Sequence, residues 1–221
     1  MIVTGASGGL GGAVARRLLE YGWRVVAPIM SNGHTVPDGA VKVVAALMDP
    51  AAVDEVAEVA GHPRAPLRAV VNLVGGYAGG SRVHETPIDA FEAQLRLNLR
   101  PTYLVTAAAL PQLIAAGGGS VVCVSSRAAV RPFVGAAGYI TAKAALLAFV
   151  DALAVEYRDD HVRVNAVLPS VIDTPTNRAA QPDADFARWV TPAQIAEVIC
   201  VLTSPTSAAT SGAHIPIYGL A

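Results

Sequence analysis

A tyrosine and a lysine one helical turn apart, Tyr139 and Lys143, are the residues of this sequence whose types and spacing best suit chemistry. Side chains at positions i and i+4 project from one face of a helix, so the ammonium group can lie close to the phenol. A free phenol has a pKa of about 10, and a nearby positive charge stabilises the phenolate. The pair therefore predicts a tyrosine that exchanges a proton with an alcohol or a carbonyl group.

A glycine-rich segment, Thr-Gly-Ala-Ser-Gly-Gly-Leu-Gly from Thr4 to Gly11, opens the chain between a short apolar run and a helical pattern. In that context the backbone N–H groups at a helix N-terminus can hold a phosphate group. Such turns also serve only to connect a strand tightly to a helix. Ser126, thirteen residues before Tyr139, supplies a second hydroxyl. Together with the Tyr139–Lys143 pair, the two features predict a nicotinamide-dependent oxidoreductase.

Short runs of β-branched residues alternate with longer segments of helical period, which indicates βαβ units. Near-continuous apolar strands are typical of a parallel sheet covered on both faces. We expect an α/β fold: a single domain over residues 1–221 with a Rossmann-like, doubly wound parallel sheet. The predicted strands are 2–3, 24–27, 69–73, 120–124, 162–168 and 213–217, and the predicted helices are 12–21, 51–60, 88–110, 137–157 and 191–203.

One irregular excursion interrupts this pattern at residues 173–190, which include Pro175, Pro182 and several charges. We expect a substrate-side loop there, either a mobile lid or an ordinary surface loop. The first strand is very short, so either the strand is truncated or the recorded start lies downstream of the real one.

The composition excludes several classes of function. With 53% hydrophobic and 15% charged residues the chain can bury a large core, and a net charge of −1 without a cationic cluster argues against nucleic acid. Cys123 and Cys200 lie in apolar runs and are expected to be buried thiols. The five histidines have no ligand spacing, so we predict no metal. No uninterrupted apolar run reaches about 18 residues, so we expect a cytoplasmic protein with no membrane partner.

In the order and spacing of its motifs the chain resembles the short-chain dehydrogenase/reductase family over essentially its whole length. Thr4 to Gly11 fill the family's TGxxxGxG turn, and the Asn-Leu-Val-Gly segment 72–75 stands where the family usually has Asn-Asn-Ala-Gly. The segment 169–174 matches Pro-Gly-x-Ile-x-Thr, with Ser170 in place of the glycine. Asn98 falls on the helix position of the catalytic asparagine.

The resemblance implies a role for each polar residue. Tyr139 would give a proton to the carbonyl oxygen as hydride arrives from nicotinamide, and Ser126 would hydrogen-bond the same oxygen. Lys143 would lower the pKa of the tyrosine and hold the nicotinamide ribose, and Asn98 would hold a water of a proton relay. Singly, each residue also has an ordinary surface or helix interpretation. The implied catalytic residues are Asn98, Ser126, Tyr139 and Lys143, and the implied cofactor-binding residues are Gly5, Ser7, Gly9, Leu10, Gly11, Ser31, Asn72, Val74, Gly75, Tyr139, Lys143, Ile172 and Thr174.

The sequence favours NADP(H), with NAD(H) as the alternative. No Asp or Glu follows the second strand, where a carboxylate would bind the adenosine ribose. A phosphate there would depend on Ser31, Asn32 or a more distant cation such as Arg16 or Lys42. The Asp-Val pair that usually meets adenine is replaced by Ala46-Leu47.

We expect a small organic carbonyl compound or alcohol as the substrate. The alternatives are a 3-oxoacyl group on a carrier protein or coenzyme A, for which Arg127 and Arg131 are the candidate basic residues, and a non-catalytic nucleotide-binding redox sensor. The resemblance also implies a homotetramer or homodimer built on the helices around 95–110 and 146–157.

The segment 75–80, Gly-Gly-Tyr-Ala-Gly-Gly, is richer in glycine than is usual in the family and is similar to the quinonoid dihydropteridine reductases of the same superfamily. Tyr77 could be a stacking surface for a flat substrate or an ordinary packed loop aromatic, and we favour the second interpretation. Phe133, Val134 and Trp189 predict a largely apolar substrate pocket.

Overall fold

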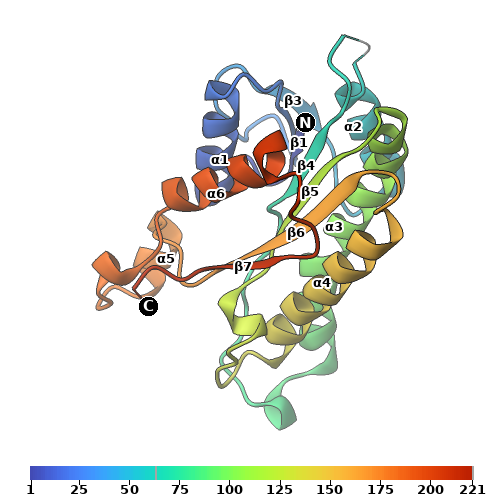
Figure 1. Cartoon of the computed structure of the whole chain (residues 1–221). Helices are drawn as coiled ribbons and strands as arrows, with labels where there is room; N and C mark the ends of the chain where they lie inside the picture. The colour runs from blue at the N-terminus through green and yellow to red at the C-terminus, as the bar shows by residue number, and fades with distance from the viewer. Residues whose placement is uncertain (63, 221) are drawn as a thin grey trace.

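The computed structural model describes residues 1–62 and 64–220, and its strands form one parallel sheet in the order β3-β2-β1-β4-β5-β6-β7 (Figure 1). The chain runs from β1 to the β3 edge and then returns past β1 to β4, so the strand order reverses there. Ligands of such sheets bind at the carboxyl ends of the strands beside this reversal. The strands are β1 (Ile2–Val3), β2 (Val26–Ile29), β3 (Val41–Val44), β4 (Ala69–Asn72), β5 (Gly119–Val124), β6 (Val162–Pro169) and β7 (His214–Ile217).

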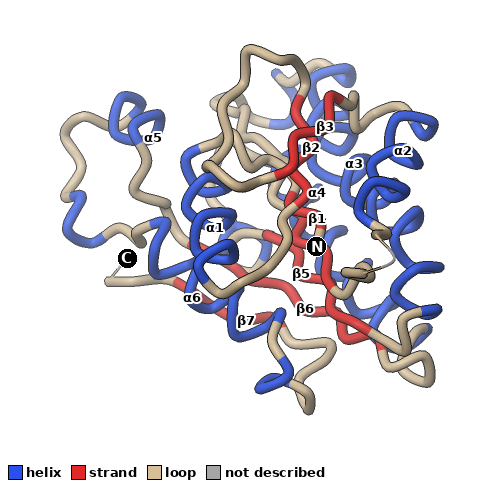
Figure 2. The backbone as a smooth tube through the Cα atoms, turned by 90° about the horizontal axis from the view of Figure 1, so that it is seen from above, coloured by secondary structure: helices blue, strands red, loops and turns tan. Residues whose placement is uncertain are grey.

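Helices cover both faces of the sheet, as Figures 1 and 2 show, and confirm the predicted doubly wound α/β fold. Three helices pack on one face: α2 (Pro50–Ala60), α3 (Ile88–Ala115) and α4 (Ala137–Glu156). Two pack on the other: α1 (Gly9–Glu20) and α6 (Pro192–Thr203). The short α5 (Pro175–Ala180) projects away from both layers. Single 3-10 turns complete the structure: η1 (Val83–Glu85), η2 (Arg127–Ala129), η3 (Phe186–Arg188) and η4 (Pro205–Ser207).

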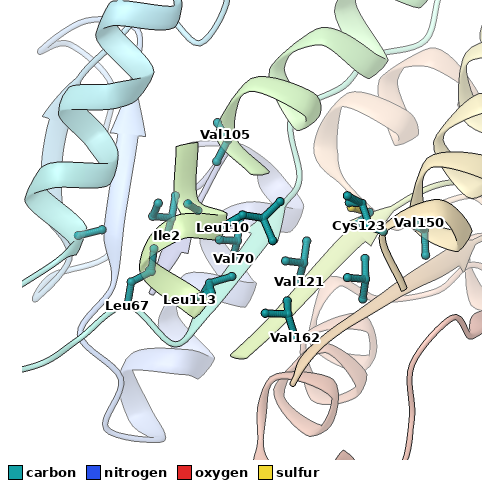
Figure 3. Close-up of a cluster of buried hydrophobic side chains, with 14 of the residues drawn as sticks. Ile2, Leu67, Val70, Val105, Leu110, Leu113, Val121, Cys123, Val150 and Val162 are labelled. Atoms are coloured by element: carbon teal, nitrogen blue, oxygen red, sulfur yellow. The ribbon is translucent and has the colours of Figure 1, made fainter. Parts of the chain in front are cut away.

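Two apolar clusters, one on each face, hold the sheet between its helices. Neighbouring strand residues contribute to opposite clusters: Val70 packs under α2 and α3, whereas Val71 packs under α1 and α6. Because both faces are covered, the central strands need apolar residues at every position and show little alternation. Figure 3 shows part of the first cluster, where Leu110 and Leu113 of α3 lie over Val70 and Val121.

Helix α4 is long and apolar enough to cross a membrane by length and composition alone. A core helix passes the same test, and α4 packs against α3 and β6 through residues such as Leu146 and Val150. Its place in the core therefore explains the buried part of its apolar surface, which is 39% of the apolar window.

The structure corrects three predicted elements. The prediction missed β3, which is a four-residue edge strand with exposed Lys42 and Val44, so it lacks a continuous apolar run. β2 runs through Pro28 to Ile29. Pro28 has no N–H group to donate, but this interrupts no pairing with β1, because β1 pairs with β2 only at Val26. The segment 173–190 contains helix α5, which Thr174 caps by accepting a hydrogen bond from the Asn177 N–H.

Candidate active site

The four predicted catalytic residues come together at the carboxyl ends of the central strands. Ser126 lies two residues after the end of β5. Its hydroxyl accepts a hydrogen bond from the Ala128 N–H at 3.1 Å, which caps the start of η2. Tyr139 and Lys143 occupy the first two turns of α4, and Asn98 lies in α3. These elements are neighbours because α3 and α4 pack together over β5 and β6.

Lys143 is buried, with 5% of its surface exposed, although it carries a charged group. Its Nζ donates a hydrogen bond to the Val124 carbonyl at 2.9 Å and lies 5.9 Å from the centroid of the Tyr139 ring. The buried Ser125 hydroxyl donates to the backbone carbonyl of Lys143 at 2.8 Å, which ties this turn of α4 to the end of β5. Burial lowers the pKa of Lys143 to about 8, because the charged form has lost its water.

Tyr139 is half-buried, and burial raises the pKa of its phenol above the ordinary value. A hydrogen bond with Ser126 opposes this shift, while the neighbouring Tyr77 phenol adds to it. Lys143 is not among the causes of this shift, and its ammonium donates to the Val124 carbonyl. The predicted lowering of the tyrosine pKa by Lys143 stays a prediction.

Asn98 is fully buried and holds the backbone of the glycine-rich segment 75–80. Its Nδ2 donates to the Gly76 carbonyl and to the Gln94 carbonyl, both at 3.0 Å, and its Oδ1 accepts from the Gly76 N–H at 3.1 Å. Both amide hydrogens are therefore used within the protein. The predicted relay water stays a prediction, and only Oδ1 of this side chain has a lone pair left for it.

Gly75 is packed closely against two of these residues. A Cβ atom placed there would stand 2.7 Å from Asn98 Oδ1 and 3.0 Å from Lys143 Nζ, both closer than ordinary contact. Because Gly75 has no side chain, these two polar atoms can approach its backbone beside Tyr139. Gly75 itself is exposed.

The glycine-rich turn has the features of a phosphate site. Gly5 adopts a φ of +69°, and a Cβ at Gly11 would overlap the Gly5 carbonyl oxygen, so both positions require glycine. Gly8 begins α1 without a side-chain cap, and no acidic residue occupies the first turn. The N–H groups and the positive end of the helix dipole are therefore available to a diphosphate.

Thr4 shapes this turn and was not among the predicted site residues. Its buried hydroxyl accepts hydrogen bonds from the N–H groups of Leu73 at 2.9 Å and Val74 at 3.3 Å. Thr4 thus ties the turn after β1 to the residues that follow β4, at the point where the strand order reverses. A threonine directly before the first glycine was the sequence signal for this role.

The remaining predicted cofactor residues differ in their surroundings. The Thr174 methyl group lies against Gly9, at 3.1 Å from a Cβ placed there, so residue 174 does reach the turn. Ser7 is exposed beside the turn, while Leu10 packs partly into the core, which leaves only its backbone for a ligand. Ser31 follows β2, where its hydroxyl contacts His34 Nδ1 at 3.0 Å.

Two further predicted cofactor residues make their contacts within the protein. Asn72 is buried and its Nδ2 donates to the Thr106 hydroxyl at 3.0 Å, so its side chain is directed into the sheet–helix interface and not to the cleft. Ile172 pairs with Val190 in an isolated bridge that closes the neck of the 173–190 segment. Trp189, expected to line the pocket, is instead buried, with its ring centroid 4.8 Å from that of Phe186.

Comparison with known proteins gives the same family as the motifs. The sequence model described as short chain dehydrogenase matches residues 1–185. The chain belongs to the short-chain dehydrogenase family. It is 31% identical over 99% of its length, and 96% of the other chain, to 2-(R)-hydroxypropyl-CoM dehydrogenase of Xanthobacter autotrophicus. It is 30% identical, over 99% and 94%, to cis-4-hydroxycyclohexanecarboxylate dehydrogenase of Sinomonas cyclohexanicum.

A solved structure of a short chain dehydrogenase/reductase family protein superposes with a TM-score of 0.89 at 29% identity, covering 99% of this chain and 94% of the other. This short-chain dehydrogenase is therefore an oxidoreductase that acts on CH–OH groups with a nicotinamide cofactor. The open N-terminus of α1 fits the diphosphate of such a cofactor.

Proposed function

We propose that this protein reduces the carbonyl group of a small organic compound, or oxidises the corresponding secondary alcohol, with NADP(H). The observation that carries the proposal is the half-buried Tyr139 phenol, whose pKa is raised by burial and which has Ser126 and Lys143 as neighbours. When bound, the nicotinamide supplies or accepts the hydride.

The protein's own residues carry the proton and orient the substrate. Tyr139 donates its phenolic proton to the carbonyl oxygen, and Ser126 donates a hydrogen bond to the same oxygen as negative charge develops there. In its protonated form, Lys143 then stabilises the tyrosinate that remains. The Asn98 side chain keeps the Gly76 backbone in place.

Replacement of Tyr139 by Phe tests this role. We expect the rate of NADPH oxidation with a reducible ketone to fall by about a hundredfold or more, because general acid catalysis is lost, while cofactor binding persists. Ser126→Ala is the companion variant and should lose less, since the acid remains. An unchanged rate in Tyr139→Phe would refute the assignment and would favour the non-catalytic sensor.

Support for NADP(H) comes from the region next to the glycine turn. No carboxylate lies at the end of β2 among Met30, Ser31 and Asn32, and a cavity of about 530 Å³ between α1 and the 35–38 loop is lined by Ser7 and Arg16. A guanidinium there can bind the 2′-phosphate of NADP(H). Asp38 lines the same cavity and is the competing acceptor for an NAD(H) ribose.

Parallel titrations with NADPH and NADH separate these two alternatives. We expect Arg16→Ala to weaken NADPH binding by about tenfold, the effect of losing one charged hydrogen bond, and to leave NADH binding unchanged. Asp38→Asn should weaken neither. Tighter binding of NADH than NADPH, with loss of that binding in Asp38→Asn, would overturn the NADP(H) proposal.

No observation favours a 3-oxoacyl carrier as the substrate, because Arg127, one of its two candidate cations, lies over the Tyr218 ring at 5.3 Å.

We also propose a homodimer or homotetramer built on α3 and α4. Tyr103 of α3 is 55% exposed and pairs with Phe149 of α4 at 5.8 Å, so this surface offers aromatic area to a second copy. Light scattering should find an oligomer that Tyr103→Glu dissociates, and a monomeric wild type would contradict this.

A further inference from the structure

Two aromatic side chains stand beside the catalytic hydroxyl with much of their surface uncovered. Tyr77 is 57% exposed, and its ring centroid lies 5.2 Å from that of Tyr139 with the ring planes at 89°. Phe133 is 50% exposed and lies 6.1 Å from Tyr77 at 47°. The sequence had favoured ordinary packing for Tyr77. Packing would cover the ring, whereas this ring touches the proton donor and leaves its remaining surface open.

The segment that carries Tyr77 is fixed at three successive points. The Asn98 side chain binds both backbone groups of Gly76, the Gln94 Oε1 accepts from the Ala78 N–H at 3.3 Å, and the Gly80 N–H donates to the Gly135 carbonyl at 2.7 Å. Gln94 and Asn98 are one turn apart on α3, so one helix holds both sides of the tyrosine. Because the backbone on both sides of Tyr77 is already fixed, little conformational entropy is lost when a ligand orders this segment.

Glycines allow this segment to close against the loop before α4. A Cβ at Gly79 would overlap the Gly135 carbonyl oxygen and stand 2.9 Å from the Tyr77 hydroxyl, and Gly80 and Gly135 have φ values of +130° and +81°. A side chain at Gly79 or Gly135 would push the two loops apart, and the positive φ of Gly80 also favours glycine. The glycine richness that the sequence shows around Tyr77 therefore brings Tyr77 and Phe133 together.

Beyond Phe133 the surface continues into a cavity of about 430 Å³. Val83, Val134 and Ile140 line it, and its only charged lining residue among the described part of the chain is Arg82. Tyr77 and Phe133 are here called the aromatic wall: Tyr77 contacts the Tyr139 ring, and Phe133 lines the apolar cavity.

We propose that Tyr77 determines specificity: with Phe133 it selects substrates whose carbonyl group is attached directly to a flat, conjugated ring. The inference rests on the proposed function, because the carbonyl oxygen must lie at the Tyr139 hydroxyl. A ring bonded to that carbonyl carbon is then close enough to contact the wall. Flat rings pair edge-to-face or offset with aromatic side chains, and a puckered saturated ring of similar size lacks the π-electron faces for such pairs.

Two ketones of similar size and different ring shape test the proposal: acetophenone, which is flat, and cyclohexyl methyl ketone, which is puckered. Each is titrated calorimetrically into protein saturated with the oxidised nicotinamide dinucleotide, so no reaction occurs. We expect the wild type to bind acetophenone about two- to tenfold more tightly, which is the value of one aromatic pair. Tyr77→Leu should abolish this preference, and Tyr77→Phe, which keeps the ring, should retain it.

A purely structural role for Tyr77 would lower the affinity for both ketones equally in Tyr77→Leu, and that result overturns the proposal. A wild type without preference, or one that binds neither ketone, overturns it as well. Unfolding and cofactor titrations of Tyr77→Leu should match those of the wild type. The proposed function is tested separately, since Tyr139→Phe should keep the ring preference while it loses the reduction of acetophenone. If the wild type shows the ring preference but reduces neither ketone, only the proposed function is contradicted.

Discussion

The buried Lys143 should make the stability of this protein depend on pH in a way that one substitution removes. Its pKa falls from the ordinary value of 10.5 to about 8 in the folded chain. At a pH between these two pKa values, Lys143 binds more protons in the unfolded state than in the folded state, so the free energy of unfolding rises with pH. The penalty for burying the charge is fully present below about pH 8 and declines as the pH rises to about 10.5. The full difference amounts to about 3 kcal/mol, at about 1.4 kcal/mol per pKa unit.

The perturbation is Lys143→Met, which keeps the apolar stem and removes the charge. Integration of the proton difference from about pH 6.5 to about pH 9.5 gives about 2 kcal/mol. Over that interval the wild type should gain about 2 kcal/mol of unfolding free energy relative to Lys143→Met, measured by urea denaturation at both pH values. Exposed Lys42 in β3 supplies the control, because Lys42→Met should follow the wild type. Parallel pH dependences of the wild type and Lys143→Met would refute the reasoning about burial.

Two further substitutions test the packing around the site. Gly11→Ala should cost about 1–3 kcal/mol in thermal unfolding, since its Cβ overlaps the Gly5 carbonyl and the turn must open; a variant with wild-type stability and cofactor affinity would contradict this. Thr106→Val leaves the buried Asn72 amide with only the weak acceptor Cys123 Sγ and should cost about 1–3 kcal/mol in denaturant unfolding. Thr102→Val, one turn earlier on α3 and equally buried, is the matched control, and equal losses in both variants would show that the Asn72 bond is not responsible.

Much of the fold could be predicted because each layer leaves a periodic signal. The strands β4, β5 and β6 are buried on both faces and read as continuous apolar runs, and the prediction placed them to within a residue or two. The edge strand β3 and the six-residue α5 were missed. Their short lengths and exposed side chains leave no hydrophobic period to detect.

The grouping of Ser126, Tyr139 and Lys143 could be predicted because their spacing follows from helix and strand geometry, and the structure does bring them together. Their catalytic roles stay predictions. The electrostatics could not be predicted. A spacing of four residues places Lys143 near Tyr139, but the sequence does not show that Nζ is bound to the Val124 carbonyl and fully desolvated. The position of Tyr77 likewise depends on contacts from α3 and from Gly135, which lie far away in the sequence.

The most direct test of the account is a nicotinamide fluorescence titration of the wild type and Gly75→Val with NADPH and NADH. We expect the folded wild type to bind nicotinamide dinucleotide, with NADPH preferred. Gly75→Val should bind neither dinucleotide, because its side chain would clash with Asn98 Oδ1 and Lys143 Nζ and displace them. Folded wild-type protein that binds neither dinucleotide, or a Gly75→Val variant that binds as tightly as the wild type, would contradict the account.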